Sequence, residues 1–221
     1  MKPVMVGIVG GSGSGKTTLA NGLALLTGRY GSRVISQDHY YRGVPSGRDP
    51  ETVNFDEPEA LDLDLLARHL QAAGRGDEFL MPLYDFSTHC RLARNERVVP
   101  VPLMIVEGLF LYSSAPLREA FDLRFFVDVP VGERLRRRIA RDTVERERVV
   151  EDIVRQFEQQ VEPMYERHIA PTRRYADYVL DLPHPDDRVY CEHTLEMWRR
   201  VEQLLRGRGF PLKPGDVDTG T

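Results

Sequence analysis

The sequence has few cysteines, no long apolar run and no excess of positive charge, and each shortage excludes a class of protein. Its two cysteines, Cys90 and Cys191, are too few for a disulfide framework and lack the spacing of a metal site. No stretch approaches the roughly 18 apolar residues of a membrane helix. The net charge of −4 disfavours a general nucleic-acid binder. We therefore expect a soluble, cytoplasmic protein with neither a nucleic-acid nor a membrane partner.

The length of 221 residues fits one α/β domain with a substantial core. Short apolar runs alternate with helical patterns, as a parallel sheet covered by helices requires. The predicted strands are 3–9, 33–37, 102–107, 123–129 and 177–181, and the predicted helices are 16–28, 59–73, 131–144, 149–169 and 191–206. The first run leads directly into a glycine-rich segment, so we interpret it as a core strand and not as a signal peptide. We expect one domain over residues 1–206, followed by a loosely ordered tail over 207–221.

Residues 80–101 differ from the rest of this pattern. Two extended arms flank a polar turn, and the arms contain Pro82 and Pro100. Because proline cannot donate to a strand ladder, it disfavours central strands. The segment therefore predicts a β-hairpin outside the main sheet.

Residues 10–17 form a complete phosphate-binding loop, Gly-Gly-Ser-Gly-Ser-Gly-Lys-Thr, between a predicted strand and a predicted helix. Glycines let backbone N–H groups turn toward phosphate oxygens, and the following helix directs its positive end at them. Lys16 would then bridge the outer phosphates, and the Thr17 hydroxyl would ligate Mg²⁺. This context disfavours the alternative of a plain Gly/Ser-rich turn. The expected ATP-binding residues are Gly10, Gly11, Ser12, Gly13, Ser14, Gly15, Lys16, Thr17 and Thr18.

A second buried strand, 102–107, ends in Glu107 and then Gly108. In a phosphate-loop fold, an acid at the carboxyl end of such a strand lies beside the metal. We therefore expect Glu107 and Thr17 to be the magnesium neighbours. The alternative is a surface glutamate at the end of a strand.

Residues 134–148 contain seven arginines in a chain that is acidic overall. A guanidinium can grip phosphate oxygens with two donors and stays charged when partly buried. Some of these arginines would simply belong to a solvated helix face, balanced by nearby acids. Arg138 and Arg141, three residues apart, share one face. We expect a mobile arginine lid over the transferred phosphoryl group, with Arg141 as a catalytic residue.

Asp38 follows the strand-like segment 33–37. An acid beyond the carboxyl end of a parallel strand lies in the crevice where such sheets bind ligands. Asp38 could accept the proton of an acceptor hydroxyl or align that hydroxyl. The alternative is a turn or helix cap.

Taken together, these segments resemble the uridine (uridine–cytidine) kinases, P-loop kinases related to phosphoribulokinase, from about residue 5 to 181. The resemblance implies a P-loop NTPase-type three-layer fold with a central parallel sheet. It also implies ATP, or alternatively GTP, as phosphate donor, Mg²⁺, a small nucleoside substrate and a homotetramer. The motifs that carry it are Gly-Gly-Ser-Gly-Ser-Gly-Lys-Thr-Thr at 10–18, Ser-Gln-Asp-His-Tyr-Tyr-Arg at 36–42, Asn-Phe-Asp-Glu-Pro-Glu-Ala-Leu-Asp at 54–62, Pro-Leu-Tyr-Asp-Phe-Ser-Thr-His-Cys-Arg at 82–91, Glu-Gly at 107–108, Arg-Arg-Ile-Ala-Arg-Asp at 137–142, Glu-Arg-Glu-Arg at 145–148 and Pro-Thr-Arg-Arg-Tyr-Ala-Asp at 171–177.

The resemblance also implies individual roles. Asp38 matches the base that acts on the 5′-hydroxyl of the nucleoside, and Asp56 matches the carboxylate that grips the ribose hydroxyls, with Arg138 beside it. The positions that match base-contacting residues are Tyr84, Phe86 and His89, and those that match lid and nucleoside-pocket residues are Arg141, Arg146, Arg148 and Gln156. Without the resemblance, Asp56 could cap a helix that begins near Pro58, Tyr84 and Phe86 could be packing residues, and His89 could be incidental in a turn.

Three departures from the family pattern affect this interpretation. Glu57 stands where histidine is usual, Glu147 replaces a glycine between two lid arginines, and residues 181–187 are acidic and proline-rich where a basic, glycine-rich loop is common. The predicted function is ATP-dependent phosphorylation of the 5′-hydroxyl of uridine and cytidine, as in pyrimidine salvage. The alternatives are a related kinase for another nucleoside or a sugar phosphate, and a nucleotide-binding regulatory switch.

Overall fold

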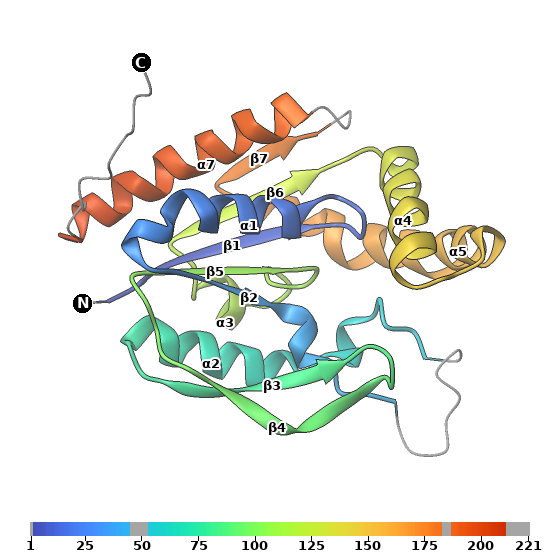
Figure 1. The fold of residues 1–221 in the computed structure, drawn as a ribbon, viewed down its shortest axis with the longest axis horizontal. Helices are drawn as coiled ribbons and strands as arrows, with labels where there is room; N and C mark the ends of the chain where they lie inside the picture. Colours follow the sequence, from blue (N-terminus) through green and yellow to red (C-terminus); the bar gives the residue numbers. More distant parts are fainter. Residues whose placement is uncertain (1, 45–52, 183–186, 211–221) are drawn as a thin grey trace.

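Five parallel strands form the central sheet of the computed structural model, which describes residues 2–44, 53–182 and 187–210 (Figure 1). The strands are β1 (Val4–Gly10), β2 (Ser32–Ser36), β5 (Leu103–Gly108), β6 (Leu123–Asp128) and β7 (Tyr178–Asp181). Their order is β2-β5-β1-β6-β7, with β1 paired to β5 on one side and to β6 on the other. The predicted central parallel sheet is confirmed.

Helices cover both faces of this sheet. The α-helices are α1 (Lys16–Thr27), α2 (Leu63–Arg75), α3 (Ala115–Arg118), α4 (Val131–Glu145), α5 (Val150–Gln156), α6 (Glu162–Met164) and α7 (Asp187–Gly207). The single-turn elements are the 3₁₀ turns η1 (Gly28–Tyr30), η2 (Gln37–Tyr40), η4 (Pro58–Ala60) and η7 (Ala170–Tyr175) and the π-helical turns η5 (Phe157–Val161) and η6 (Tyr165–Ile169). Within the described part of the chain, no helix is both long enough and apolar enough to cross a membrane.

The alternation of side chains along β1 builds a separate core on each face of the sheet. Val6 and Ile8 pack with α1 and α7 on one face, whereas Met5 and Val9 pack with α2 and the hairpin on the other. Figure 1 shows these layers, with α1 and α7 on one side of the sheet and α2 on the other. All four β1 side chains are at most 1% exposed, which accounts for the continuous apolar run in the sequence.

The predicted hairpin forms a two-stranded antiparallel sheet of its own, from β3 (Phe79–Asp85) and β4 (Cys90–Val98). The register shifts between Pro82 and Tyr84, as expected where proline interrupts a ladder. Phe79, Met81 and Val98 are buried in the core that contains Met5, Val9 and α2. The hairpin is therefore fixed to the domain through one of its faces. Its turn lies at the same end of the molecule as α4 and α5 (Figure 1).

One predicted helix boundary was wrong, and one predicted helix is irregular inside its bounds. Residues 150–169 are helical throughout, close to the predicted 149–169, but they run through α5, a π-helical turn, α6 and a second π-helical turn. Pro163 lacks an N–H and its ring clashes with the carbonyl four residues earlier, which interrupts the α-helical pattern. The helix expected from residue 59 begins at Leu63, because the Asp62 side chain caps it by accepting from the Leu65 N–H at 3.2 Å.

The C-terminal end of the described chain remains in contact with the domain. Phe210 is 7% exposed and packs with the core beneath α7. The Arg208 guanidinium pairs with Asp122. The folded part therefore extends to Phe210, and the remainder of the predicted tail, 211–221, lies outside the described residues.

Candidate active site

The phosphate loop connects β1 to α1 at the carboxyl edge of the sheet. Gly13 and Gly15 have positive φ angles of 77° and 87°. A Cβ atom at Gly13 would lie 2.3 Å from the Arg134 carbonyl oxygen, so only glycine allows α4 to approach the loop this closely. Lys16 is the first residue of α1, and its Nζ lies 4.0 Å from Glu107 Oε2. The loop thus places its lysine next to an acid from the neighbouring strand β5.

Glu107 is buried, with its side chain 4% exposed, so the alternative of a surface glutamate is wrong. It lies beside Ser36 in the β2–β5 register. Burial raises the pKa of the Glu107 carboxyl, and the charge of Lys16 opposes that rise. A buried acid at this place needs a cation, and Lys16 supplies one.

The residues present fit a magnesium ion bound through a nucleotide. Among the described residues, no three His, Cys, Asp or Glu side chains gather into a metal cluster. Mg²⁺ in nucleotide sites does not require one, since it keeps several waters and takes one or two protein ligands plus phosphate oxygens. The Thr17 hydroxyl lies near enough to the Glu107 carboxyl to lower its pKa, so the two predicted ligands are neighbours.

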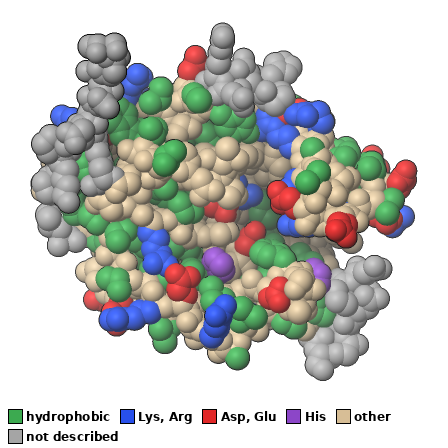
Figure 2. Space-filling model, in the orientation of Figure 1, with side chains coloured by type: hydrophobic (Ala, Val, Ile, Leu, Met, Phe, Trp, Pro, Cys, Tyr) green, Lys and Arg blue, Asp and Glu red, His purple; other side chains and the backbone are tan. Residues whose placement is uncertain are grey.

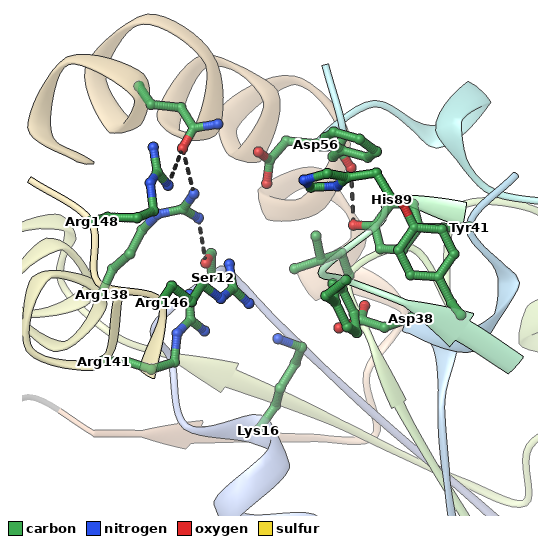
Figure 3. A pocket seen from close by; sticks show the side chains of 15 residues that line it. Ser12, Lys16, Asp38, Tyr41, Asp56, His89, Arg138, Arg141, Arg146 and Arg148 are labelled. Atoms are coloured by element: carbon green, nitrogen blue, oxygen red, sulfur yellow. Dashed lines mark hydrogen bonds between the residues drawn. The ribbon is translucent and has the colours of Figure 1, made fainter. Parts of the chain in front are cut away.

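A cavity of about 140 Å³ lies between the phosphate loop, the hairpin and the α4–α5 arm (Figure 3). It opens in the hollow between that arm and the main body, where acidic and basic side chains meet (Figure 2). Its lining contains every residue predicted for catalysis or substrate binding. The lining residues are Ser12, Lys16, Asp38, Tyr41, Phe55, Asp56, Tyr84, Phe86, His89, Leu109, Arg138, Arg141, Arg146, Arg148 and Gln156.

A second cavity of about 430 Å³ also borders the phosphate loop. Lys16 and Arg141 line both cavities, so these two cations stand where the two spaces meet. The remaining lining residues of the second cavity are Gly13, Gly15, Thr17, Thr18, Arg137, Glu145 and Tyr190. The arrangement suits a donor nucleotide on one side, an acceptor on the other, and transfer between them.

Asp38 lies in the turn η2, directly after β2. The cap of this turn is Ser36, whose hydroxyl accepts from the Asp38 N–H at 3.3 Å, so the Asp38 carboxylate is not the cap. No described residue donates a hydrogen bond to that carboxylate. Burial raises the pKa of Asp38, and the charges of Lys16, Arg146 and Arg141 oppose the rise. A buried carboxylate with a raised pKa and free lone pairs is suited to accept a proton from a hydroxyl.

Asp56 lines the same cavity, across from the labelled arginines (Figure 3). It does not cap a helix, because α2 is capped by Asp62 and the turn η4 has no side-chain cap. Its backbone N–H donates to Asn54 Oδ1 at 3.0 Å, while Asn54 Nδ2 donates to Glu57 Oε1, also at 3.0 Å. Burial raises the pKa of Asp56, and Arg138 opposes the rise more than any other charge. As with Asp38, no described residue donates a hydrogen bond to its carboxylate.

Aromatic side chains form one wall of the cavity that contains Asp38 and Asp56, the predicted acceptor cavity. Tyr84 contacts Phe86 edge-on, with ring centroids 5.1 Å apart, and Phe55 stacks on His89, also at 5.1 Å. The Tyr84 hydroxyl is buried without a hydrogen-bond partner among the described residues, and burial raises the pKa of Tyr84 to about 12. An orphaned hydroxyl in a cavity wall is a position for a polar group of a ligand. The sequence analysis missed Phe55 and Tyr41 as lining residues, although both lie inside the motifs it quoted.

One of the predicted lid arginines, Arg138, is connected to the phosphate loop by a hydrogen bond, and Gln156 links it to a second lid arginine. Arg138 donates to Ser12 Oγ at 2.8 Å and to Gln156 Oε1 at 3.0 Å, and Arg148 donates to the same Gln156 oxygen at 2.8 Å. Gln156 therefore lines the cavity and also holds two guanidinium groups in place. Glu147, the residue in the glycine position, adopts a left-handed φ of 54°.

Two contacts with the phosphate loop were not predicted from the sequence. Arg137 and Tyr190 both donate to the Ser14 carbonyl oxygen, at 3.2 Å and 3.3 Å. Arg137 belongs to the arginine-rich segment noted in the sequence, but nothing there distinguished it from its neighbours. Tyr190 lies in α7, far along the chain, and no sequence pattern indicates that it reaches the loop.

A parallel sheet with a phosphate loop at its carboxyl edge, facing a cavity lined by arginines, defines a P-loop kinase fold. Residues 5–186 match the model of the phosphoribulokinase/uridine kinase family, and the chain belongs to that family. A uridine kinase of Deinococcus deserti is 40% identical over 187 residues, which cover 83% of this chain and 89% of that protein. A uridine kinase of Chloroflexus aurantiacus is 38% identical over 179 residues, which cover 80% of this chain and 86% of that protein.

The fold is also shared with a solved structure, described as a possible uridine kinase from Bacillus stearothermophilus. The alignment has a TM-score of 0.57 at 22% identity and covers 81% of this chain and 89% of that chain. At this level of identity the similarity concerns the fold. The chemistry must be argued from the cavity itself.

Proposed function

We propose that this protein transfers the γ-phosphoryl group of ATP to the 5′-hydroxyl of uridine and cytidine. The observation that carries the proposal is the acceptor cavity, in which two buried carboxylates, Asp38 and Asp56, face Lys16 and Arg141 without hydrogen-bond partners among the described residues. A nucleotide switch that used water alone would need no such pocket. The names of the similar proteins, uridine kinases, agree with a nucleoside as acceptor.

The chemistry follows from the positions of the side chains. Asp38 accepts the proton of the 5′-hydroxyl as its oxygen attacks the γ-phosphorus, and the bond from that phosphorus to the β–γ bridging oxygen breaks to release ADP. Lys16 and Arg141, which line both cavities, stabilise the charge of the group in transfer. Thr17 and Glu107 would hold Mg²⁺, which neutralises phosphate charge when bound. Asp56 accepts hydrogen bonds from the ribose hydroxyls.

A panel of acceptors tests this proposal against a kinase for another nucleoside or for a sugar phosphate. Purified protein is incubated with ATP and Mg²⁺ and one acceptor at a time, and the release of ADP is followed. We expect turnover with uridine and cytidine and none with purine nucleosides or sugar phosphates. Turnover with a sugar phosphate alone would contradict the assignment of the acceptor.

The proposed setting is pyrimidine salvage in the cytoplasm, with ATP as donor and GTP as an alternative. Both cysteines are free and exposed, which suits a reducing compartment. A donor series of ATP and GTP at a fixed uridine concentration distinguishes the two nucleotides.

The Asp56→Ala variant is expected to lose ribonucleoside turnover far more than nucleotide binding. A site built to hydrogen-bond a hydroxyl leaves a buried polar group unpaired when that hydroxyl is missing, and such sites discriminate strongly. The wild-type enzyme is therefore also expected to prefer uridine to 2′-deoxyuridine. Steady-state kcat/KM for both nucleosides measures the effect, and Asp64→Ala, which removes an exposed acid of α2, is the control. Equal kcat/KM for the two nucleosides in the wild type would argue decisively against this role.

His89→Tyr is expected to change the ratio of uridine to cytidine kcat/KM by at least about tenfold, or roughly 1.4 kcal/mol. The two bases differ at position 4, where one offers an acceptor and the other a donor. An imidazole can present either through its two nitrogens, whereas a phenol has a different reach.

The backbone conformation of His89 makes a second variant necessary as a control. Its φ of 54° is left-handed, so tyrosine introduces strain as well as a new ring. His89→Asn removes the ring with a residue that tolerates this conformation, and it should also shift the ratio. If the ratio stays unchanged in both variants while activity is retained, His89 does not read the base.

A further inference from the structure

One buried acid has no part in the chemistry described above. Asp142 lies in the last turns of α4 and its side chain is 0% exposed. It does not line either cavity. Four arginines that do line the acceptor cavity surround it, namely Arg138, Arg141, Arg146 and Arg148.

The local structure brings these arginines to one carboxylate. Arg138 lies one helical turn before Asp142, and α4 ends at Glu145. The chain then reverses through Glu147, and the Arg148 N–H donates to the Asp142 carbonyl oxygen at 3.1 Å. This turn returns the last two lid arginines to the helix that carries the first two.

The carboxylate attracts the guanidinium groups but forms a hydrogen bond with only one of them. Arg141 Nε donates to Oδ1 at 2.8 Å. Arg138 Nε and Arg148 Nη1 lie 3.5 Å and 3.6 Å from Oδ2, which is buried and has no hydrogen-bond partner in the part of the chain that the structure describes. Arg146 Nε lies 3.8 Å from Oδ1. Asp142 thus attracts three of the four guanidinium groups by charge without forming a hydrogen bond to them. Arg138 and Arg148 each use part of their donors on Gln156, and Arg138 also donates to Ser12.

The balance of charge explains why such an anchor is needed. Five cationic side chains line the acceptor cavity against two carboxylates, Asp38 and Asp56. Like charges at this density repel one another, and without a counter-ion the long arginine side chains would spread into solvent. The Asp142 carboxylate supplies that counter-ion from behind the lining, where it does not repel a bound phosphate directly.

We propose that Asp142 is a positioning residue that directs the four lid arginines at the transferred phosphoryl group while it forms a hydrogen bond with only one of them. The proposal rests on the proposed phosphoryl transfer and adds the residue that organises the arginines. It predicts a separation of effects. Loss of the carboxylate keeps all the cations that attract a nucleotide, but it removes the geometry on which turnover depends.

Asp142→Asn tests this separation, because asparagine has the same shape and no charge. We expect kcat to fall by about ten- to a hundredfold, since small misplacements of positioning groups can cost about 10²-fold. The dissociation constant for ATP, measured by fluorescence competition in the absence of acceptor, should stay the same or become smaller. Circular dichroism gives the folded fraction to which kcat is normalised. Asp152→Asn is the matched control, because it removes an exposed acid of α5 that pairs only with Arg155 among the described residues.

Other results would overturn the proposal. A normal kcat in Asp142→Asn would do so, as would a loss of kcat and ATP affinity in parallel with the folded fraction. If that variant does not fold, Asp142→Glu keeps the charge but extends it by one methylene, and it should lower kcat with unchanged ATP affinity. A wild-type kcat in Asp142→Glu would then contradict the role. A wild-type protein inactive toward every acceptor contradicts the proposed function instead, so the two failures are distinguishable.

Discussion

Asp38→Asn is expected to lower kcat by about a hundred- to ten-thousand-fold, which is the usual range for removal of a general base. Asparagine keeps the size of the side chain but cannot take the proton of the 5′-hydroxyl. The second cavity, which we propose for the nucleotide phosphates, does not include Asp38 in its lining, so ATP affinity should survive. Single-turnover phosphorylation of uridine, with ATP binding measured separately, gives both quantities.

The dependence on pH provides an independent check of the same residue. Burial raises the pKa of Asp38, so the base is protonated at a higher pH than an exposed aspartate. Wild-type kcat should therefore fall as the pH decreases through this raised pKa, and the decline should be absent from the residual activity of Asp38→Asn. Asp38→Glu, which keeps a base but displaces it, should give an intermediate rate. An Asp38→Asn enzyme with a near-normal kcat would remove Asp38 from the mechanism.

Lys16→Ala is expected to reduce both ATP affinity and kcat, with kcat falling by about 10²–10³-fold. Lys16 begins α1 and lines both cavities, so in the proposed mechanism it would contact the outer phosphates before and during transfer. Its loss also leaves Glu107 buried without its nearest cation, 4.0 Å away. The pKa of Glu107 should rise further, which weakens any metal held there.

The combined loss distinguishes Lys16 from Asp38, whose removal should affect turnover alone. ATP binding by fluorescence competition and steady-state kcat are compared in both variants. Lys2→Ala is the control. Lys2 is an exposed lysine that precedes β1, at the opposite end of that strand from the phosphate loop. If Lys16→Ala binds ATP as tightly as the wild type, the phosphate loop does not act as proposed.

The sequence predicted those parts of the site in which a chemically informative residue stands directly beside a predictable strand or helix. The phosphate loop could be assigned because a buried strand precedes it and a helix follows it. Glu107 could be placed because a buried strand ends there. For Asp38 and Asp56 the sequence left two roles open, a functional carboxylate or a helix cap. The structure shows that other residues are the caps, Ser36 for η2 and Asp62 for α2.

The sequence could not predict contacts that depend on how distant elements pack. Asp142 had the appearance of one acid among several that balance a basic helix, yet it is the point on which four arginines converge. Tyr190 reaches the phosphate loop from α7 only because α7 packs beside α1. The α-helix is interrupted around Pro163. The helical pattern of 149–169 was given more weight in the prediction than this proline, so the interruptions were not predicted. The homotetramer implied by the family resemblance stays a prediction.

The release of ADP by the wild-type protein with ATP and Mg²⁺, in the presence and absence of uridine, tests the central claim most directly. The account predicts steady turnover only when uridine is present, with one uridine 5′-monophosphate formed for each ADP, as identified by mass spectrometry. Steady ATP hydrolysis that is indifferent to uridine, with no phosphorylated nucleoside formed, would contradict it and favour a nucleotide-binding switch.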